Sequence, residues 1–381
     1  MIELPWDKKS VPHCVLEINQ QCNLSCRACY REKTGGSKSV AAIMADLDTI
    51  ERHQQVQTVS VAGGEPTLHP DLVEIVSAIH GRGHSVSLVT NGLLLTDQLL
   101  FRLKLAGLDI VMIHVDEGQQ RPDLPAGPTV ADINRLRREI ARRVAAHGID
   151  AGLCVTIYRE HFENLKELFE CMLATPEINF LFATHAVEID DIVANSGIGS
   201  GTVRPHIYRS APSRNSDVIA FFEKHFRLKP YACIPPRCSD ESELPCISYF
   251  VPVVHGRNDN RIIGVASGAA ELFLIRLSRL LKGRYLYYCK NRWLMNAIQL
   301  VVNGIANRCL TAHAGTLLRS LRPGARLHSK RLVFENAPVV MPDGTVNCCD
   351  FCPNSTARNG RVIPVCLADH LEPPGVESCN A

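Results

Sequence analysis

The sequence lacks the long apolar runs found in membrane-spanning and exported proteins. Nowhere in its 381 residues do 18 uncharged apolar residues follow one another, so we expect no membrane-spanning helix. The first ten residues (MIELPWDKKS) contain acids and a proline and have no apolar segment typical of a secretory signal. We therefore expect a cytoplasmic protein, in a compartment where cysteines bind metal, do redox chemistry or pack in the core.

The sequence also has little net charge and few aromatic residues. A formal charge of +2 excludes a nucleic-acid polycation as a description of the whole chain. Aromatic residues are 6% of the chain, and no aromatic-plus-glycine stacking motif is present, so a nucleic-acid partner is not expected. Hydrophobic residues make up 46% and charged residues 21%, a balance typical of a folded core.

Cysteine is abundant, with 16 residues, and its distribution is uneven. Cys22, Cys26 and Cys29 lie close together near the N-terminus, and ten cysteines follow residue 232. Cys154 and Cys171 stand alone and are expected to be core thiols. The bunching indicates two metal-binding regions separated by an ordinary scaffold.

The scaffold alternates short strands with helices. Strands are predicted over 13–19, 58–62, 85–90, 109–115, 150–157 and 179–184, and helices over 39–53, 71–80, 97–106, 130–147 and 162–173. Short connections between such units require parallel strands joined by right-handed helical crossovers. Six units are too few for an eight-stranded barrel, so we predict an α/β fold with a partial (β/α)6 TIM-like barrel. A doubly wound open sheet is the alternative.

Three regions are predicted along the chain. Residues 1–190 form the barrel, 191–230 a linker or covering loop rich in Gly, Ser, Arg and Pro, and 231–381 a smaller Cys-rich α+β region. In either sheet topology the site is expected at the C-terminal ends of the strands. The residues that follow successive strands there are the cysteine triplet, Gly63-Gly64-Glu65-Pro66, Asn91, and His114-Val115-Asp116.

The triplet has the spacing C-x3-C-x2-C, which can turn three thiolates toward one site. Three thiolates suit a soft metal, but structural zinc usually has a fourth protein ligand. A [4Fe–4S] cluster held by three cysteines leaves one iron open. On spacing alone, a zinc loop and buried thiols remain alternatives.

Together these segments resemble the radical S-adenosylmethionine superfamily, over about Val11 to Phe182. The resemblance implies that Cys22, Cys26 and Cys29 hold a [4Fe–4S] cluster whose open iron binds S-adenosylmethionine. It also implies that Gly63, Gly64, Glu65 and Pro66 contact the methionyl amino group. Glycines allow close backbone approach, and Glu65 could pair with an ammonium.

Further cofactor contacts are implied by the same resemblance. Asn91 lies where the family often has a polar contact to the ribose or carboxylate. His114-Val115-Asp116 lies where many members have a Ser-x-Asp segment, which makes Asp116 a second candidate contact. The family usually has an aromatic residue just before the third cysteine, near the adenine. Here Ala28 takes that position and Tyr30 follows the cysteine, which makes Tyr30 the candidate adenine contact.

The implied reaction needs an external one-electron donor of flavodoxin or ferredoxin type. Reductive cleavage of S-adenosylmethionine would give methionine and a 5′-deoxyadenosyl radical, which abstracts hydrogen from an unactivated C–H bond. The cofactor supplies the hard chemistry, while the protein orients the substrate and excludes water.

The C-terminal cysteines form a second candidate metal site. Residues 339–352 are predicted to form a hairpin that is followed by a turn at Asn359-Gly360. Cys349, Cys352 and Cys366 could then bind a second Fe–S cluster, because the unit loosely resembles auxiliary-cluster domains of the same superfamily. A fourth ligand could be Cys348, Cys309, Cys246 or none. Structural zinc and no metal are the alternatives.

A long basic segment precedes this hairpin, from Leu272 to Phe334, with twelve Lys or Arg residues and no acid. Interleaved apolar residues indicate one or two basic amphipathic helices. Peripheral contact with the inner membrane face, a pocket for a lipid or other hydrophobic or phosphorylated substrate, and a simple solvated face all fit this pattern. A peptide-modifying maturase and a non-catalytic zinc or iron–sulfur interaction protein remain alternative functions.

Overall fold

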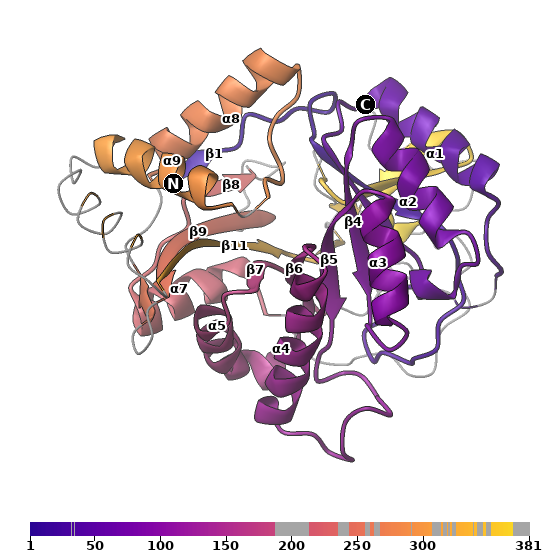
Figure 1. The fold of residues 1–381 in the computed structure, drawn as a ribbon, viewed down its shortest axis with the longest axis horizontal. Coiled ribbons are helices and arrows are strands. Elements are labelled where there is room, and N and C mark those ends of the chain that lie inside the picture. Colours follow the sequence, from indigo (N-terminus) through magenta and orange to yellow (C-terminus); the bar gives the residue numbers. More distant parts are fainter. Residues whose placement is uncertain are drawn as a thin grey trace.

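The computed structural model shows a mixed α/β molecule in which helices surround a curved sheet (Figure 1). It describes residues 1–368 except 32, 34, 187–212, 235–243, 256–259, 263–266, 291, 307–313, 315–317, 319–320, 322–324, 338, 341–345 and 348–351. In this part of the chain, no helix is both long and apolar enough to cross a membrane.

Six parallel strands form the main part of the sheet, in the order in which they occur in the chain. They are β2 (His13–Glu17), β3 (Thr58–Ala62), β4 (Ser85–Thr90), β5 (Leu108–His114), β6 (Asp150–Ile157) and β7 (Ile178–His185). A doubly wound sheet reverses its strand order part-way, and this one does not. The predicted partial barrel is therefore confirmed, and the doubly wound alternative is wrong.

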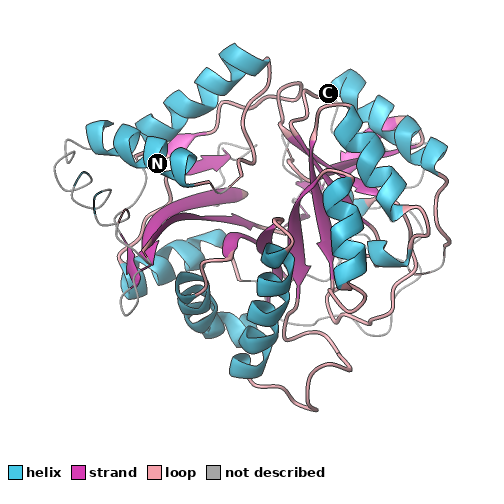
Figure 2. Ribbon diagram, viewed as in Figure 1, coloured by secondary structure: helices cyan, strands magenta, loops and turns pink. Residues whose placement is uncertain are grey.

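The connecting helices cover the outside of these strands (Figure 2). They are α1 (Val40–His53), α2 (Leu72–Gly81), α3 (Asp97–Leu105), α4 (Val130–Ala146) and α5 (Leu165–Ala174). Each predicted helix is present. A short 3₁₀ turn, η1 (Pro66–Leu68), follows β3, and another, η2 (Arg159–Asn164), replaces the first turn predicted before α5. Thr129 and Asp132 form a capping box at the start of α4, which fixes where this helix begins.

Residues beyond the first half add strands to the same sheet. The strand β11 (Arg326–Glu335) pairs in parallel with β7, and β9 (Cys246–His255) pairs antiparallel with β11. Three short strands continue from β9: β8 (Ala232–Ile234), β1 (Ile2–Glu3) and β10 (Asn260–Ile262). Within the predicted linker, residues Asn215–Phe226 form the helix α7, so this part of the linker is helical.

Two helices of the predicted basic segment are present, α8 (Gly268–Lys282) and α9 (Trp293–Ala306). The segment between them lies against the N-terminal ends of the barrel strands. Arg284 donates to the carbonyl oxygen of Val56 over 2.8 Å, and the backbone N–H of Tyr288 donates to Oε1 of Gln57 over 3.0 Å. Tyr288 also donates its hydroxyl to Asp150. The segment between α8 and α9 therefore closes the opening of the barrel at the N-terminal ends of its strands.

The C-terminal strands form two hairpins. The strand β12 (Val339–Val340) pairs antiparallel with β13 (Val346–Asn347), as predicted. The strand β14 (Ser355–Arg358) pairs with β15 (Arg361–Pro364) through Asn359 and Gly360, which both have positive φ angles, as the tightest hairpin turns require. A last 3₁₀ turn, η3 (Val365–Leu367), follows. The second hairpin lies beside β2 and α1 (Figure 1).

This hairpin occupies the opening that the partial barrel leaves between β2 and β11. On one side the carbonyl oxygen of Pro353 accepts a hydrogen bond from Nδ1 of His13, in β2. On the other side, Nδ2 of Asn354 donates to Oε2 of Glu335, at the end of β11, over 2.7 Å. Two consecutive residues thus bridge β2, at one edge of the sheet, and the end of β11. We call Cys352–Asn354 the seam segment.

Candidate functional site

A cavity of about 270 Å³ runs from the C-terminal ends of the strands into the barrel. Many of the residues singled out in the sequence line it: Cys22, Cys26, Cys29, Tyr30, Gly63, Gly64, Glu65, Asn91, Cys352 and Cys366. Pro66 and Asp116 are buried beside it and are not among the lining residues. Residues that are far apart in sequence therefore meet at one site, as expected when parallel strands end at one edge of a sheet.

The cysteine loop is fixed to the neighbouring loop that follows β5. The backbone N–H of Arg27 donates to the carbonyl oxygen of Gly118 over 2.9 Å. The side chain of Gln119 donates to Sγ of Cys26 over 3.5 Å. Burial, together with the nearby charges of Asp116 and Cys29, raises the pKa of the Cys26 thiol to about 12. Burial also raises the pKa of Cys22.

The two glycines after β3 place that loop against the backbone of residues 19–21. The amide of Gly64 donates to the carbonyl oxygen of Asn19 over 2.9 Å, and the amide of Glu65 donates to that of Gln21 over 2.7 Å. A Cβ atom on Gly64 would collide with the carbonyl oxygens of Gln20 and Gln21. Gly63 has a φ of +155°, which other residues rarely adopt. The glycines therefore bring the two loops close enough for these bonds to form.

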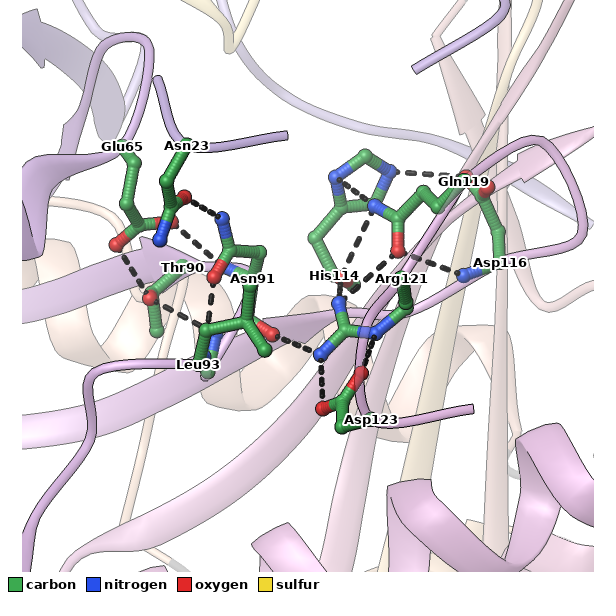
Figure 3. A network of polar contacts seen from close by, with 11 residues as sticks. Asn23, Glu65, Thr90, Asn91, Leu93, His114, Asp116, Gln119, Arg121 and Asp123 are labelled. Carbon is green, nitrogen blue, oxygen red and sulfur yellow. Dashed lines mark hydrogen bonds and ion pairs between the residues drawn. The ribbon is translucent and has the colours of Figure 1, made fainter. Parts of the chain in front are cut away.

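The carboxylate of Glu65 has its hydrogen-bonding capacity occupied inside the protein (Figure 3). Its Oε1 accepts from the amide and hydroxyl of Thr67, over 3.0 and 2.5 Å, and from the hydroxyl of Thr90 over 2.6 Å. Its Oε2 accepts from the amide of Asn91 over 2.8 Å. With only 1% of the residue exposed, the carboxylate ties the end of β3 to the end of β4. The suggested ion pair with an ammonium would have to displace these bonds.

Asn91 and the loop after β5 form one polar network (Figure 3). Nδ2 of Asn91 donates to Oδ1 of Asn23 over 2.7 Å, and its carbonyl oxygen accepts from Nη2 of Arg121 over 2.9 Å. Arg121 is held in turn by a two-point ion pair with Asp123. Through Arg121, the loop after β5 fixes the loop after β4.

Asp116 is buried, and it faces His114. Oδ2 of Asp116 lies 2.9 Å from Nε2 of His114, and its Oδ1 accepts from the amide of Gly118 over 2.9 Å. Burial acts to raise the pKa of Asp116, but the interaction with His114 and the bond from Gly118 outweigh it and lower the pKa. His114 lines the cavity. The sequence placed it after the fourth barrel strand, but gave it no separate role.

Tyr30 lies at the junction with the C-terminal hairpin. Burial raises its pKa, and the thiols of Cys29 and Cys366 both lie close enough to contribute. The next residue, Arg31, forms an ion pair with buried Glu17, which also accepts from Nε and Nη2 of Arg358 over 3.2 and 3.1 Å. This carboxylate thus holds the cysteine loop and the hairpin to the end of β2.

The second group of candidate cysteines is described in part. Cys352 and Cys366 line the cavity, while Cys348 and Cys349 lie outside the described residues. Because the seam segment carries Cys352 and η3 carries Cys366, both C-terminal cysteines reach the same cavity as the N-terminal triplet.

Deeper in the barrel, most of the lining surface of the cavity is apolar and comes from Val89, Ile110, Met112, Phe180 and Phe182. His13, Thr58, Ser60 and Ser87 add polar groups from β2, β3 and β4. Cys154, expected in the core, also lines it, because alternate residues of β6 face inward. The neighbouring position in β5, paired with Cys154, is that of His114.

One buried acid faces this apolar part. Glu335 lines the cavity, and its Oε1 has no hydrogen-bond partner within the described structure. Burial raises its pKa to about 7, and the bond from Asn354 only partly offsets the effect. A buried carboxyl oxygen without a partner is costly, so this atom marks a position where a ligand could bind.

Residues 16–172 match the sequence model of the Radical SAM superfamily. The chain therefore contains a radical SAM domain over these residues. It is therefore an enzyme of the kind that uses a [4Fe–4S] cluster and S-adenosylmethionine. The matched residues span β2 to α5 and include the cysteine triplet and the Gly63–Pro66 loop.

Curated relatives share parts of this radical SAM chain. The Pyrococcus furiosus "tungsten-containing aldehyde ferredoxin oxidoreductase cofactor-modifying protein" is 27% identical over 55% of this chain and 62% of its own length. A "probable GTP 3′,8-cyclase" of Saccharolobus islandicus is 29% identical over 44% of this chain and 46% of its own length. The chain thus spans about half to three fifths of these relatives.

Solved structures give weaker similarities. Streptococcus suis SuiB bound to S-adenosylmethionine is 14% identical, with a TM-score of 0.40 over 57% of this chain and 49% of its own. The structure of anSMEcpe with bound AdoMet is 14% identical, with a TM-score of 0.40 over 56% of this chain and 58% of its own.

The triplet has the donor chemistry that a radical SAM cluster needs. Cys22, Cys26 and Cys29 are not joined in disulfides and line one cavity. Among the described residues, no group of three or more His, Cys, Asp or Glu side chains is arranged to hold a single metal ion. A cluster makes a different demand, because each cysteine binds a different iron atom and the sulfurs need not converge on one point. The triplet therefore fits a cluster better than a single zinc ion.

Proposed function

We propose that this radical SAM enzyme abstracts hydrogen from a hydrophobic substrate, held in the part of the barrel cavity that lies nearer the N-terminal ends of the strands. The observation that carries the proposal is the cavity itself, which joins the cysteine triplet at one end to an apolar chamber. When bound, the cluster and S-adenosylmethionine together supply the radical that removes the hydrogen atom. An external one-electron donor of flavodoxin or ferredoxin type would supply the electron.

In this proposal Cys22, Cys26 and Cys29 bind three irons of the cluster. The Gly63–Pro66 loop meets the methionyl ammonium through backbone carbonyl groups, because the carboxylate of Glu65 is already bonded to Thr67, Thr90 and Asn91. Asn91 and His114 line the cavity on either side and contact the polar parts of the cofactor. Asp116 holds His114 in place.

The lining favours one part of the predicted substrate range. Val89, Ile110, Met112, Phe180 and Phe182 offer apolar surface, which suits a lipid or other hydrophobic molecule. The free oxygen of Glu335 would accept a hydrogen bond from a hydroxyl or N–H group of the substrate. A phosphate would be disfavoured beside this carboxyl group, because both are acidic.

Cys352 and Cys366 support a second metal site next to the substrate. Both reach the cavity, and we propose that they bind an auxiliary Fe–S cluster with Cys348 and Cys349. Its distance from the substrate would decide whether it binds the substrate or only carries electrons.

The test is anaerobic reconstitution followed by iron and sulfide analysis and a dithionite-driven assay for 5′-deoxyadenosine. The wild type should yield 5′-deoxyadenosine, and a Cys22→Ala/Cys26→Ala/Cys29→Ala variant should not. Cys171→Ala is the matched control, because Cys171 is a buried thiol of α5 outside the cavity. Iron that persists in the triple variant would measure the auxiliary site. A triple variant that loses no iron would show the triplet assignment to be wrong.

The two alternative functions predict different results in the same assay. A non-catalytic interaction protein would give zinc or no chromophore, and no 5′-deoxyadenosine. A peptide-modifying maturase would give 5′-deoxyadenosine but modify a peptide. Mass spectrometry of substrate mixtures, incubated with the wild type and with Glu335→Gln, identifies which molecule is modified. It thereby distinguishes a peptide substrate from a hydrophobic one.

A further inference from the structure

The helix α9 presents apolar side chains to the outside, and its buried face combines polar residues with Ala297 and Leu300, which pack against Leu327. Leu294, Ile298, Val301 and Ile305 are exposed and follow one another at spacings of four, three and four residues. Such spacing places side chains on one stripe of a helix. In a surface helix of a globular protein this stripe normally faces the core. Here it faces away from it.

The inward face of α9 binds through hydrogen bonds. Buried Asn296 donates to the carbonyl oxygen of Leu327 over 3.1 Å and accepts from the hydroxyl of Ser329 over 2.7 Å. Buried Asn303 donates to Oε1 of Glu271, in α8, over 3.2 Å. Polar groups thus attach α9 to β11 and α8, and this arrangement specifies which face of the helix points outward.

The neighbouring helix α8 extends the apolar surface. Phe273, Leu280 and Leu281 are exposed, with 82% of Leu280 and 72% of Leu281 accessible. Trp293, at the start of α9, is also exposed. The two helices contact each other on the outer side of the sheet (Figure 1). We call the eight exposed residues the outer apolar patch: Phe273, Leu280, Leu281, Trp293, Leu294, Ile298, Val301 and Ile305.

Cations accompany this patch. Arg276 and Lys282 are exposed residues of α8, and Arg292 is an exposed residue directly before α9. Within the described part of the chain, no acid forms an ion pair with any of the three. The sequence has no Asp or Glu between Leu272 and Phe334. An apolar surface with cations and no acids is complementary to a layer that is apolar inside and anionic at its surface.

We propose that the outer apolar patch docks this protein onto an anionic lipid bilayer, with α8 and α9 lying in the plane of the interface. The helices have 15 and 14 residues, too few to span a bilayer but enough to lie within its headgroup boundary. The exposed tryptophan suits this position, since Trp is enriched at membrane interfaces.

A second copy of the chain fits the patch less well. A two-fold interface brings the same surface of both copies together. Arg276, Lys282 and Arg292 would then be buried against a surface that carries the same three cations, and desolvated like charges are costly. Anionic lipid headgroups neutralise these cations instead.

Vesicle co-sedimentation of the full chain tests the proposal. The probes are vesicles of phosphatidylcholine with phosphatidylglycerol, and vesicles of phosphatidylcholine alone. The wild type should bind the anionic vesicles, and high salt should weaken this binding. The Leu280→Asp/Leu281→Asp variant should bind at least about tenfold more weakly, because two exposed leucines can no longer insert. Lys282→Gln should lower the affinity about fivefold.

A matched control is available on another helix. Leu105, in α3, is 73% exposed, so Leu105→Asp introduces one of the two added charges at an equally exposed leucine outside the patch. It should bind vesicles like the wild type. Circular dichroism and thermal unfolding check that each variant is folded.

Three outcomes would overturn the proposal. The first is a wild type that does not bind anionic vesicles. The second is equal loss of binding in Leu105→Asp and Leu280→Asp/Leu281→Asp. The third, from analytical ultracentrifugation, is a wild-type dimer that the double variant dissociates and that does not bind vesicles, which would assign the patch to a second copy. Production of 5′-deoxyadenosine without vesicles is a separate readout, so this result and the proposed radical chemistry can fail independently.

Discussion

Replacing Glu65 with Gln separates a structural carboxylate from one that binds the cofactor. In the structure, three bonds reach Oε1 and one reaches Oε2, from the amide of Asn91. Glutamine can keep the three bonds at its oxygen, but it presents an NH₂ group to the Asn91 amide. One hydrogen bond to a charged group is lost, and two buried donors then face each other. Such a loss costs about 1.5–3 kcal/mol.

We therefore expect the free energy of unfolding of Glu65→Gln to fall by about 2–3 kcal/mol in a urea titration. The control is Glu170→Gln, which removes an exposed carboxylate of α5 and should change stability by less than about 0.5 kcal/mol. Calorimetric titration of the reconstituted protein with S-adenosylmethionine supplies the second readout. If Glu65→Gln is as stable as the wild type but binds S-adenosylmethionine more weakly, the carboxylate contacts the ammonium and the structural assignment is wrong.

Three further predictions concern the closure of the barrel and its acid. Burial raises the pKa of Glu335 from 4.5 to about 7, so the native state holds a proton that the unfolded state releases, and stability falls as the pH rises from 4.5 to 7. Without ligand, the wild type should lose about 3 kcal/mol of unfolding free energy over this pH range, and Glu335→Gln should not. Parallel curves of unfolding free energy against pH for the two proteins would refute the raised pKa of Glu335. Arg358→Ala leaves Glu17 with Arg31 as its remaining described partner. It should lower the free energy of unfolding by about 2 kcal/mol and speed hydrogen exchange in β14 and β15. Unchanged exchange in these strands would show that the Glu17–Arg358 ion pair does not hold the hairpin to β2. Gly64→Ala should push the loop after β3 away from residues 20 and 21 and lower the amount of iron bound by the triplet. Gly81→Ala, which has open space around its Cβ position, should leave the iron content unchanged. Equal iron in both variants would show that the close approach of the two loops is not needed for cluster binding.

The barrel could be predicted from sequence because its elements are locally determined. The strands Thr58–Ala62, Ser85–Thr90 and Asp150–Ile157 end where the sequence places them, since each is a short apolar run bounded by polar or turn residues. The strand order then follows from the short helical crossovers. The turn at Asn359-Gly360 was predictable for the same reason, because its residue types determine its geometry.

The joining of the C-terminal strands to the sheet could not be predicted in this way. The pairing of β11 with both β7 and β9 depends on contacts between segments far apart in the sequence. The helix α7 was missed because it begins at Asn215, inside a stretch whose Gly, Ser, Arg and Pro content is typical of a loop.

The sequence predicted which residues form the candidate site, but not what each of them contacts. The spacing of Cys22, Cys26 and Cys29 and the Gly63–Pro66 loop was visible in the sequence, and both line the cavity. That Glu65 would be buried and fully bonded was not visible, because Thr90 and Asn91 reach it from another strand. The tie between Glu17 and Arg358 joins residues 341 positions apart, and no spacing rule relates them.

The seam segment makes closure of the barrel a late event in biosynthesis. Pro353 lies 340 positions after its partner His13, and Asn354 lies 19 positions after Glu335. Ribosomes therefore complete the strands β2 to β7 long before the residues that join β2 to β11 exist. Until those residues emerge, β2 is held to the nascent sheet by its pairing with β3.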